Sequence, residues 1–521
     1  MTQIQHTRVY GWRMEARNIT VNNANTAGDG DVTVNNCQIA FDSTSGSEAL
    51  AIIDATITNT PIFVRVPEPN SGSLTGSLVL NNIKLNNVPT GVVSSGQTVL
   101  NGGTTTINSW AQGNVFSGTN AKPRFLQDNI GDISKANVLL DSSGKVFGRG
   151  RPAYADYAVS QFVSVKSQGA HGDGHTDDTA LLQKIFDQAS FGFSSDRGHL
   201  ILISSTLTIP AGTQIVGEAW SNIMGSGQTF QNQNIPQAVI RVGAPGSTGT
   251  VEISGIVFTT RAPANGAIVV EWNVHDPAGQ QGAAGAWDTI IRLGGAAGTN
   301  IQEEQCSNAI DNTGDNCFAA FMGLHLTSGS SAYLEGLWVW LGDHDLDGSE
   351  SIELMAFSGR GILSESQGPV WMVGTAAEHN VLYQYNLAGA ANHYMGLIQT
   401  ETAYYQPNPV PPSPFISNSN YLDPVFSGEG AGWALYVQNS SDILVFGGGL
   451  YSFFSAGIQI IEHCRQADQQ LVNIDSSSSV GIYSFSTIGV IFQLSVDHKG
   501  VIPQSANPTG FAQVFTGWTQ H

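Results

Sequence analysis

Two glutamates in the second half of the chain could supply a pair of carboxyl groups, as cleavage of a glycosidic bond would need. Glu378 lies in the segment GTAAEHN, and Glu401 lies 23 residues further along in IQTETAYYQP. Such a reaction needs an acid that protonates the leaving oxygen and a second group that activates water or attacks the sugar. If both carboxyl groups face the same way on neighbouring strands, they cannot both ionise freely, and we expect the pKa of one to rise. The alternative is that one of them is an ordinary solvated glutamate in a loop.

Aromatic side chains in the same part of the chain could hold a sugar, because pyranose faces stack on aromatic rings. The pattern WVWLGDHD places Trp338 and Trp340 on one face of a strand, and one of the two could belong to the core. The candidates for sugar contact are Trp340, Trp371, Tyr404 and Tyr405. Most aromatic residues of a β-rich protein pack inside, so each candidate could instead be a core residue.

Polar residues follow the WVWL segment directly. Asp343, His344 and Asp345 could form hydrogen bonds to sugar hydroxyl groups, and the alternative of equal weight is a capped turn. Glu365, in the segment SES, is a third carboxylate near these residues, and a structural role is the more plausible one for it.

Short β-rich runs that end in Asn pairs recur in the first 110 residues. They read ITVNN from Ile19, VTVNN from Val32, AIIDATITNT from Ala51 and LVLNNIKLNN from Leu78. This spacing is typical of a parallel β-helix, in which each coil supplies short strands and polar turns. Asn suits the turns because its amide can bond to the coils above and below and because it tolerates left-handed backbone. The alternative is a set of hairpins in a β-sandwich.

One segment near the middle predicts a short helix. In GAHGDGHTDDTALLQKIFDQAS, Asp177 or Thr176 can cap a helix over Thr179–Ala189, whose apolar face comprises Leu181, Leu182, Ile185 and Phe186. Strand-like runs follow it, so the helix should close the end of a second β-helix. The carboxylates Asp173, Asp177 and Asp178 could instead bind calcium, although their spacing is not that of an EF-hand. Capping is the preferred interpretation.

The composition excludes several classes of partner. The chain has 20 Lys and Arg against 41 Asp and Glu, which gives a formal net charge of −21, and only 12% of its residues are charged. Nothing on such a surface would neutralise phosphates, so nucleic acid and anionic membranes are excluded, whereas a neutral glucan needs no basic patch. No run reaches 18 apolar residues, and we therefore expect no membrane span.

The four cysteines do not predict a metal site, because no CxxC pair is present. Cys306 and Cys317 lie eleven residues apart in a Gly- and Asn-rich loop and could form a disulfide. Cys37 and Cys464 could be buried thiols, or could pair with each other.

Several long stretches resemble glycoside hydrolase family 55 of fungi. GAHGDGHTDDTALLQ is similar to the start of a pectate-lyase-like β-helix domain, and VEWNVHDPAGQQGAAGAWDTIIRLGGAAGTNIQ, HLTSGSSAYLEGLWVWLGDHDLDG, GRGILSESQGPVWMVGTAAEHNVLYQYNLAGAANHYMGLIQTETAYYQP and SDILVFGGGLYSFF continue the likeness in order. The resemblance covers the chain from about Asn35 onward. It implies an all-β protein of tandem right-handed parallel β-helices, the first incomplete. The expected divisions are a partial N-terminal β-helix at 1–118, a linker at 119–160 and a second β-helix at 161–521.

The resemblance also implies an activity and roles for residues. Members of this family are exo-β-1,3-glucanases, which would make Glu401 the general acid, place Glu378 in the network that holds the nucleophilic water, and give inversion of configuration. The implied partner is a β-1,3-glucan polysaccharide or oligosaccharide, and we expect a monomer that needs no cofactor and no metal. The family also implies secretion, although the N-terminal sequence has no apolar segment typical of a signal peptide.

Two features depart from the family pattern. The GDG-TDDT segment normally opens each β-helix but occurs here only at Gly172–Thr179, and FSSDRGHL stands where a strand and a Gly-Thr-Tyr turn are usual. The first β-helix is therefore expected to be shortened, and the polar groups that it contributes to the water site are in doubt. Gln38, Gln3 and Gln5 are the glutamines in the retained part, of which Gln38 is our candidate.

Two other functions remain open at this stage. A β-helix enzyme that acts on pectin is disfavoured, since the GHG and RIK motifs of polygalacturonases are missing and the acidic chain suits a polyuronate poorly. A non-catalytic β-helix that only binds carbohydrate is the alternative of a different class.

Overall fold

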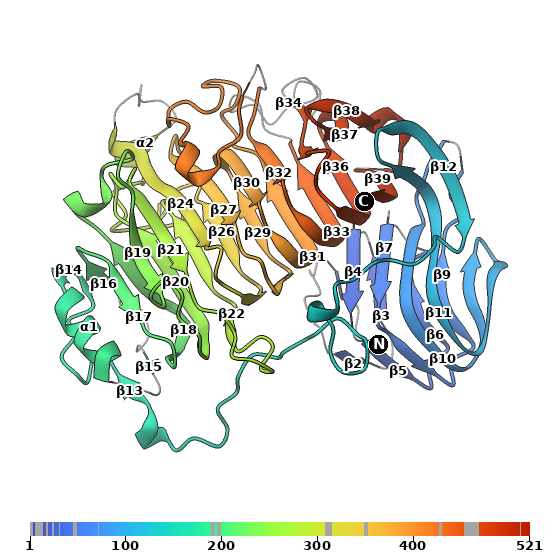
Figure 1. Ribbon diagram of the computed structural model, residues 1–521, viewed down its shortest axis with the longest axis horizontal. Coiled ribbons are helices and arrows are strands. Elements are labelled where there is room, and N and C mark those ends of the chain that lie inside the picture. Colours follow the sequence, from blue (N-terminus) through green and yellow to red (C-terminus); the bar gives the residue numbers. More distant parts are fainter. Residues whose placement is uncertain are drawn as a thin grey trace.

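The computed structural model shows a protein made almost entirely of β-strands (Figure 1). It describes residues 32–44, 49–70, 72–188, 193–194, 200–307, 315–348, 353–426, 430–452, 468–510 and 512–521, together with short strands between residues 4 and 30. Most strand pairs are parallel, and neighbouring coils of the chain stack on one another. The predicted all-β, parallel β-helix class is confirmed.

The C-terminal stack repeats a coil of three strands. One coil consists of β28 (Val370–Val373), β29 (Ala376–Glu378) and β30 (Asn380–Ala388). The next coil covers the first two positions with the single strand β31 (Ala391–Glu401), which pairs in parallel with both β28 and β29. Because the pairs are in register, residues at the same position of successive coils lie above one another.

Alternation along the strands separates the core from the outer face. The inward positions of successive coils next to the two glutamates are fully buried and comprise Val339, Ala377, Thr400 and Leu450. The residues on either side of each point outward, as the period of two requires. The sequence therefore places a continuous core inside the stack and leaves the outward positions available for function.

The N-terminal stack has the same parallel arrangement. β4 (Thr26–Gly30) pairs with β7 (Ala49–Ile53), β5 (Val32–Asn35) with β8 (Thr56–Thr58), and β6 (Ile39–Asp42) with β9 (Ile62–Val66). The long strand β10 (Ser77–Ser94) then pairs with β7, β8 and β9 in turn. The hairpin alternative fails here, because these pairs are parallel.

The recurring asparagines form a ladder at one corner of this stack. The side-chain amide of Asn59 donates to Asn36 at 3.3 Å, and that of Asn87 donates to Asn59 at 2.9 Å. All three residues have left-handed backbone, with φ values of 57°, 48° and 54° along the chain. Asn tolerates this region better than most residues, so the prediction from the repeats is confirmed in both respects.

Antiparallel strands close the N-terminal stack and join it to the other. β11 (Gln97–Ser117) runs antiparallel to β10, and β12 (Asn120–Asp128) runs antiparallel to β11. The last strand, β39 (Gln513–Gln520), pairs antiparallel with β36 (Val480–Ile488) and parallel with β11. The two stacks therefore lie side by side (Figure 1), and the segment predicted as a linker begins with a strand. The division of the chain into domains stays a prediction.

The predicted linker covers Trp371, so the prediction of this residue as a sugar contact is wrong. Trp371 is fully buried, and its indole N–H donates to the carbonyl of Leu139 at 3.1 Å. Its ring lies 5.1 Å from that of Phe147, and it belongs to an apolar cluster shared by both stacks. The side chain points outward as expected, but the linker occupies the face that a sugar would need. Its role is to hold the linker against the C-terminal stack.

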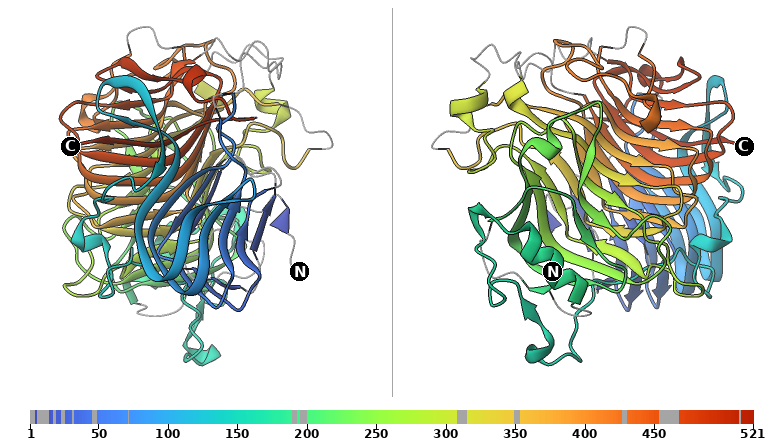
Figure 2. Two further views of the ribbon diagram at one scale, coloured as in Figure 1. Left: turned by 90° about the vertical axis from the view of Figure 1, so that its right-hand side faces the viewer. Right: turned by 60° about the vertical axis from the view of Figure 1, so that its left-hand side comes forward.

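The segment GDGHTDDT caps the first coil of the C-terminal stack as predicted. Helix α1 (Thr179–Gln188) lies at the end of the stack (Figure 2), and Asp177 accepts hydrogen bonds from the backbone N–H and hydroxyl of Thr179. Asp178 accepts from the backbone N–H groups of His171 and Gly172, which ties the preceding loop to the helix. Burial of Leu182, Ile185 and Phe186 fixes the apolar face of α1 on the core.

Among the described residues no helix is long and apolar enough to cross a membrane. A disulfide joins Cys306 and Cys317, which confirms that pairing, and Cys37 is buried and not disulfide-bonded. Cys464, like most of the FSSDRGHL segment, lies outside the described residues.

Candidate active site

Glu378 and Glu401 are opposite one another on adjacent parallel strands. The register pairs Ala376 with Gln399 and Glu378 with Glu401, so both carboxylate side chains start from the outer face of neighbouring coils. Their backbones are therefore separated by one strand spacing, about 4.8 Å. The stacking that the interval of 23 residues suggested is present.

The glutamates belong to a column of outward residues that we call the catalytic column. Its members, one from each successive coil, are Arg292, Trp340, Glu378, Glu401 and Tyr451. A second column lies two residues earlier on the same strands and comprises Ile290, Trp338, Ala376, Gln399 and Gly449. The strands that carry them are β23 (Ile290–Leu293), β26 (Trp338–Leu341), β29, β31 and β33 (Ser441–Tyr451). Side chains from five separate coils thus meet on one surface.

Glu378 is held by two donors from the neighbouring column. The indole N–H of Trp338 donates to one of its carboxylate oxygens at 2.9 Å, and the side-chain amide of Gln399 donates to the other at 2.8 Å. The residue is 4% exposed. Two N–H donors aimed at both oxygens match an ionised carboxylate, which only accepts hydrogen bonds. This arrangement holds the carboxyl group of Glu378 in one orientation.

Glu401 has different surroundings. Its side chain is 21% exposed, and one carboxylate oxygen lies 3.7 Å from Nε2 of the buried His379. The partners of Glu378 precede the pair along their strands, whereas His379 follows it. The two carboxyl groups are therefore turned toward different partners, although their backbones are neighbours. The carboxyl group of Glu378 is held by two donors, whereas that of Glu401 is partly exposed.

Two tryptophans form a flat surface beside Glu378. The rings of Trp338 and Trp340 are stacked with centroids 4.6 Å apart and an angle of 13° between their planes. Both are half-buried on the outer face, while Val339 between them points into the core. Neither tryptophan is a core residue. The expectation that one of the two could belong to the core is therefore wrong. Trp340 neighbours Glu378 in the catalytic column, as a platform for a sugar bound there would require.

Asp343 and His344 lie next to this surface. One oxygen of Asp343 is 3.0 Å from Nδ1 of His344 and 3.9 Å from Nε2 of His379. Both side chains are partly exposed, at 15% for Asp343 and 31% for His344. They therefore remain candidates for contact with sugar hydroxyl groups.

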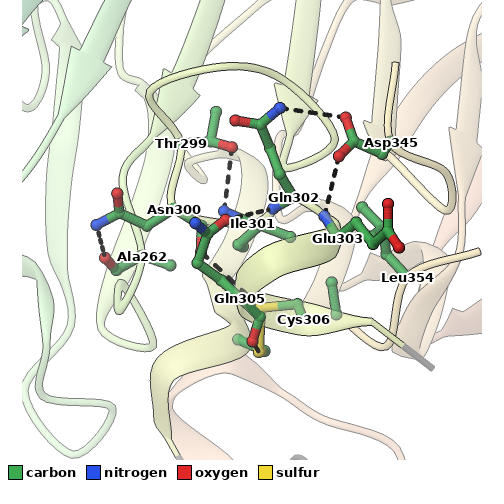
Figure 3. Close-up of a disulfide and its surroundings, with 12 residues drawn as sticks. Ala262, Thr299, Asn300, Ile301, Gln302, Glu303, Gln305, Cys306, Asp345 and Leu354 are labelled. Carbon is green, nitrogen blue, oxygen red and sulfur yellow. Dashed lines mark hydrogen bonds between the residues drawn. A yellow bond between two sulfur atoms is a disulfide. The ribbon is translucent and has the colours of Figure 1, made fainter. Parts of the chain in front are cut away.

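Asp345 has a structural role, which was the alternative to contact with a sugar. It is 6% exposed and accepts hydrogen bonds from the backbone N–H of Glu303 at 2.9 Å and the side-chain amide of Gln302 at 3.2 Å (Figure 3). These donors begin α2 (Glu303–Cys306), which carries the disulfide. Its carboxylate is thus occupied by the protein and anchors the disulfide loop beside the site.

We expect Asp345→Asn to destabilise the protein only above acidic pH. Burial raises the pKa of Asp345, but hydrogen bonds from Glu303, Gln302 and the following backbone outweigh it, and the net pKa lies below the usual value. A carboxyl group whose pKa is lower in the folded state than in the unfolded state stabilises the fold at pH values above its unfolded-state pKa. This stabilisation is lost as the pH falls through its folded-state pKa. Hydrogen bonds to a charged group are worth about 1.5–3 kcal/mol. Thermal unfolding should show a loss of about that size at pH 7 that shrinks as the pH falls below the unfolded pKa of about 3.9 and disappears below the folded pKa. Asp156→Asn, at an exposed position, should change little.

Tyr404 and Tyr405 are not available to a sugar. Both are 2% exposed, and the hydroxyl of Tyr404 donates to the carbonyl of Leu354. The ring of Tyr404 packs edge-on against His379 at 5.5 Å, and that of Tyr405 packs against Phe357 at 5.1 Å. Burial raises the pKa of both hydroxyls. Their prediction as sugar contacts is wrong because the chain turns inward directly after Glu401.

Gln38 is not brought to the glutamates. It lies exposed in the turn between β5 and β6. In this coil it is β4 that contacts β31 and β33 of the C-terminal stack. The contacts of the described residues therefore give Gln38 no role next to Glu401.

Two residues that contact the glutamates were not singled out in the sequence. Gln399 lies two residues before Glu401, so a period of two would have placed it on the same face. His379 stands in the quoted motif GTAAEHN, but no periodicity predicts that its side chain crosses to the next coil.

Comparison with known proteins identifies relatives. A protein from Cochliobolus carbonum named "Glucan 1,3-beta-glucosidase" is 37% identical over 480 residues, which cover 88% of this chain and 60% of that one. A protein from Arthroderma benhamiae named "Probable glucan endo-1,3-beta-glucosidase" is 41% identical over 395 residues, which cover 74% and 45%. This chain thus spans about half of the length of the relatives that it matches. No family model matches it.

A solved structure is also similar. It is a single-residue variant of sacteLam55A from Streptomyces sp. SirexAA-E in complex with glucose, at 12% identity and a TM-score of 0.41, covering 97% of this chain and 86% of that one. The kinship rests on the sequence relatives, whose matches cover 88% and 74% of this chain. The chain is therefore a homologue of proteins named glucan 1,3-beta-glucosidase and probable glucan endo-1,3-beta-glucosidase, which agrees with the resemblance of its motifs.

Proposed function

We propose that this chain is a glycoside hydrolase that releases glucose from the non-reducing ends of β-1,3-glucan with inversion of configuration. The observation that carries the proposal is the pair of glutamates in register whose carboxyl groups have different partners. Glu401, partly exposed and next to His379, is the general acid that protonates the leaving oxygen. Glu378, enclosed by Trp338 and Gln399, is the fixed negative charge that faces the sugar and its attacking water.

The surroundings of the pair support a sugar as the ligand. The stacked tryptophans offer an apolar platform, and Asp343 with His344 offers partly exposed polar groups. A one-coil spacing of two carboxylates by itself suits a retaining mechanism. Inversion is proposed on the family resemblance, in which polar groups hold the water in place of a single carboxylate base. The described part of the site carries several carboxylates and the cation Arg292. An acidic surface of this kind repels a polyuronate but not a neutral glucan.

The names of the relatives differ on whether chain ends or internal bonds are cut, so the cleavage mode needs its own test. The purified chain should be incubated with laminarihexaose and, as a comparison, with polygalacturonate. We expect glucose as the first product from laminarihexaose, in the α configuration by NMR, and nothing from polygalacturonate. Early release of laminaribiose and laminaritriose would overturn the exo assignment, and initial β-glucose would overturn inversion.

A folded chain that binds laminarihexaose without cleaving it would be a carbohydrate-binding module instead. Calorimetry on the same samples separates that result from a complete failure to recognise glucan.

A further inference from the structure

One corner of the C-terminal stack carries a motif that has no part in the proposed function. Asn439-Ser440-Ser441 matches the acceptor motif for an N-linked glycan, which is Asn, then any residue except Pro, then Ser or Thr. The motif begins in the turn between β32 (Trp433–Gln438) and β33. A pattern of three residues also occurs by chance, so the corner itself must show that it can carry a sugar chain.

The fold leaves the amide nitrogen of Asn439 available. Asn439 and Ser441 are exposed, whereas Ser440 between them is 2% exposed. The backbone N–H of Asn439 donates to Asp475 at 2.7 Å, and its side-chain oxygen accepts from the hydroxyl of Ser477 at 3.2 Å. Among the described residues, the side-chain nitrogen donates to none. Attachment of a glycan would leave the oxygen and one N–H of the amide in place, so these contacts survive.

The alternative is that Asn439 serves only the geometry of its corner. Its backbone is left-handed, with φ of 48°, and Asn tolerates this region. Other left-handed asparagines of the protein also use their amides to bind the preceding coil. The amide of Asn82 donates to Asp54 at 2.6 Å, and that of Asn392 donates to the carbonyl of Gln367 at 2.9 Å. Asn439 has the same backbone without such a bond to the described part of the preceding coil, so corner geometry alone leaves its amide unexplained.

The preceding coil also leaves room at this corner. The register pairs Ala388 of β30 with Gln438, so Gly389 is the residue of that coil next to Asn439. Gly389 has no side chain, and a Cβ atom placed on it would meet nothing within 4 Å beyond its own chain neighbours. A bulky group on Asn439 therefore has open space beside it, as a glycan requires.

We propose that Asn439 is a site of N-linked glycosylation. An oligosaccharide bound to a lipid diphosphate is the donor: its C1–O bond to the diphosphate breaks, a bond from C1 to Nδ2 of Asn439 forms, and the amide gives up one proton. Such transfer acts on chains that enter the secretory pathway, which the family resemblance implies for this protein. Asn439 lies just before β33, and Tyr451 of the catalytic column is the last residue of that strand. The glycan is thus attached at the far end of the strand from the catalytic column.

The test is to produce the full chain in a yeast secretion host and to locate the glycan by mass spectrometry. Peptide N-glycosidase converts a glycosylated Asn into Asp, and the change of mass identifies the residue. We expect Asn439 to be modified in the parent and unmodified in Ser441→Ala, which keeps the acceptor but removes the hydroxyl that the motif requires. Ser441→Thr keeps a hydroxyl and should be modified at least as fully as the parent. Asn507-Pro508-Thr509 is an internal control, because its Pro breaks the motif and Asn507 should stay unmodified.

The masses must be assigned residue by residue, because a second acceptor motif, Asn18-Ile19-Thr20, begins outside the described residues. A secreted parent with unmodified Asn439 would overturn the proposal, and so would a modification of Asn439 that persists in Ser441→Ala. An inactive parent that carries the glycan would refute the proposed function alone. If the parent is active, Asn439→Gln should retain its kcat on laminarihexaose, and a tenfold loss would contradict the position assigned to the glycan.

Discussion

Replacing Glu401 by Gln is expected to lower kcat on laminarihexaose by about 10²- to 10⁴-fold while leaving binding intact. Gln keeps the length and polarity of the side chain but has no proton to give to the leaving oxygen, and general acid catalysis contributes about this factor. Its amide can still form hydrogen bonds near His379, so the fold should be unaffected. Glucose release gives kcat, and calorimetry gives the affinity for the oligosaccharide.

A matched control comes from the other side of the same stack. Glu365 contacts a histidine as Glu401 does, with a carboxylate oxygen 2.6 Å from Nε2 of His325, but it lies away from the catalytic column. Glu365→Gln should retain the parental kcat. Full activity of Glu401→Gln, or equal losses in both variants, would refute the assignment of the acid.

The largest loss of stability is expected from Arg360→Met. Arg360 in β27 (Phe357–Ser364) is fully buried and forms an ion pair with Asp423, whose side chain is 1% exposed. Its guanidinium also lies 3.8 Å above the ring of Phe321. Removing one partner leaves a buried, uncompensated carboxylate, which costs about 3–5 kcal/mol. Chemical unfolding should show a loss in this range.

The double variant Arg360→Met with Asp423→Asn tests the cause. If the unpaired charge is responsible, the second substitution should restore a large part of the lost stability. Arg241→Met is the comparison within the same sheet, because its ion pair with Glu271 is partly exposed and should be worth about 1 kcal/mol or less. A loss below about 1 kcal/mol in Arg360→Met would contradict the expectation.

The fold was predictable because its signals are local and repeated. The Asn-terminated runs imply stacked corners, and Asn36, Asn59 and Asn87 form that ladder. The cap of α1 and the bond between Cys306 and Cys317 follow from short spacings as well. Each of these inferences needs only neighbouring residues or the next coil.

The outward aromatic residues were harder to interpret, because alternation gives the face of a side chain but not what covers that face. Trp340 and Trp371 both point outward, yet the linker covers only Trp371. Tyr404 and Tyr405 follow the last strand residue, Glu401, where the period of two no longer applies. His379 was missed for a related reason, since its direction depends on a left-handed corner. Long-range packing and corner geometry decide these positions.

The catalytic column keeps a constant spacing between its side chains. Arg292, Trp340, Glu378, Glu401 and Tyr451 are separated by very unequal lengths of chain, yet each lies one strand spacing, about 4.8 Å, from the next. Insertions and deletions in the loops between coils therefore leave the distances between functional groups unchanged. Substitutions can place a carboxylate on another coil of the column, but they change its position only in steps of one strand spacing. Such a scaffold lets substrate preference diverge through its loops while the spacing that the chemistry needs is inherited intact.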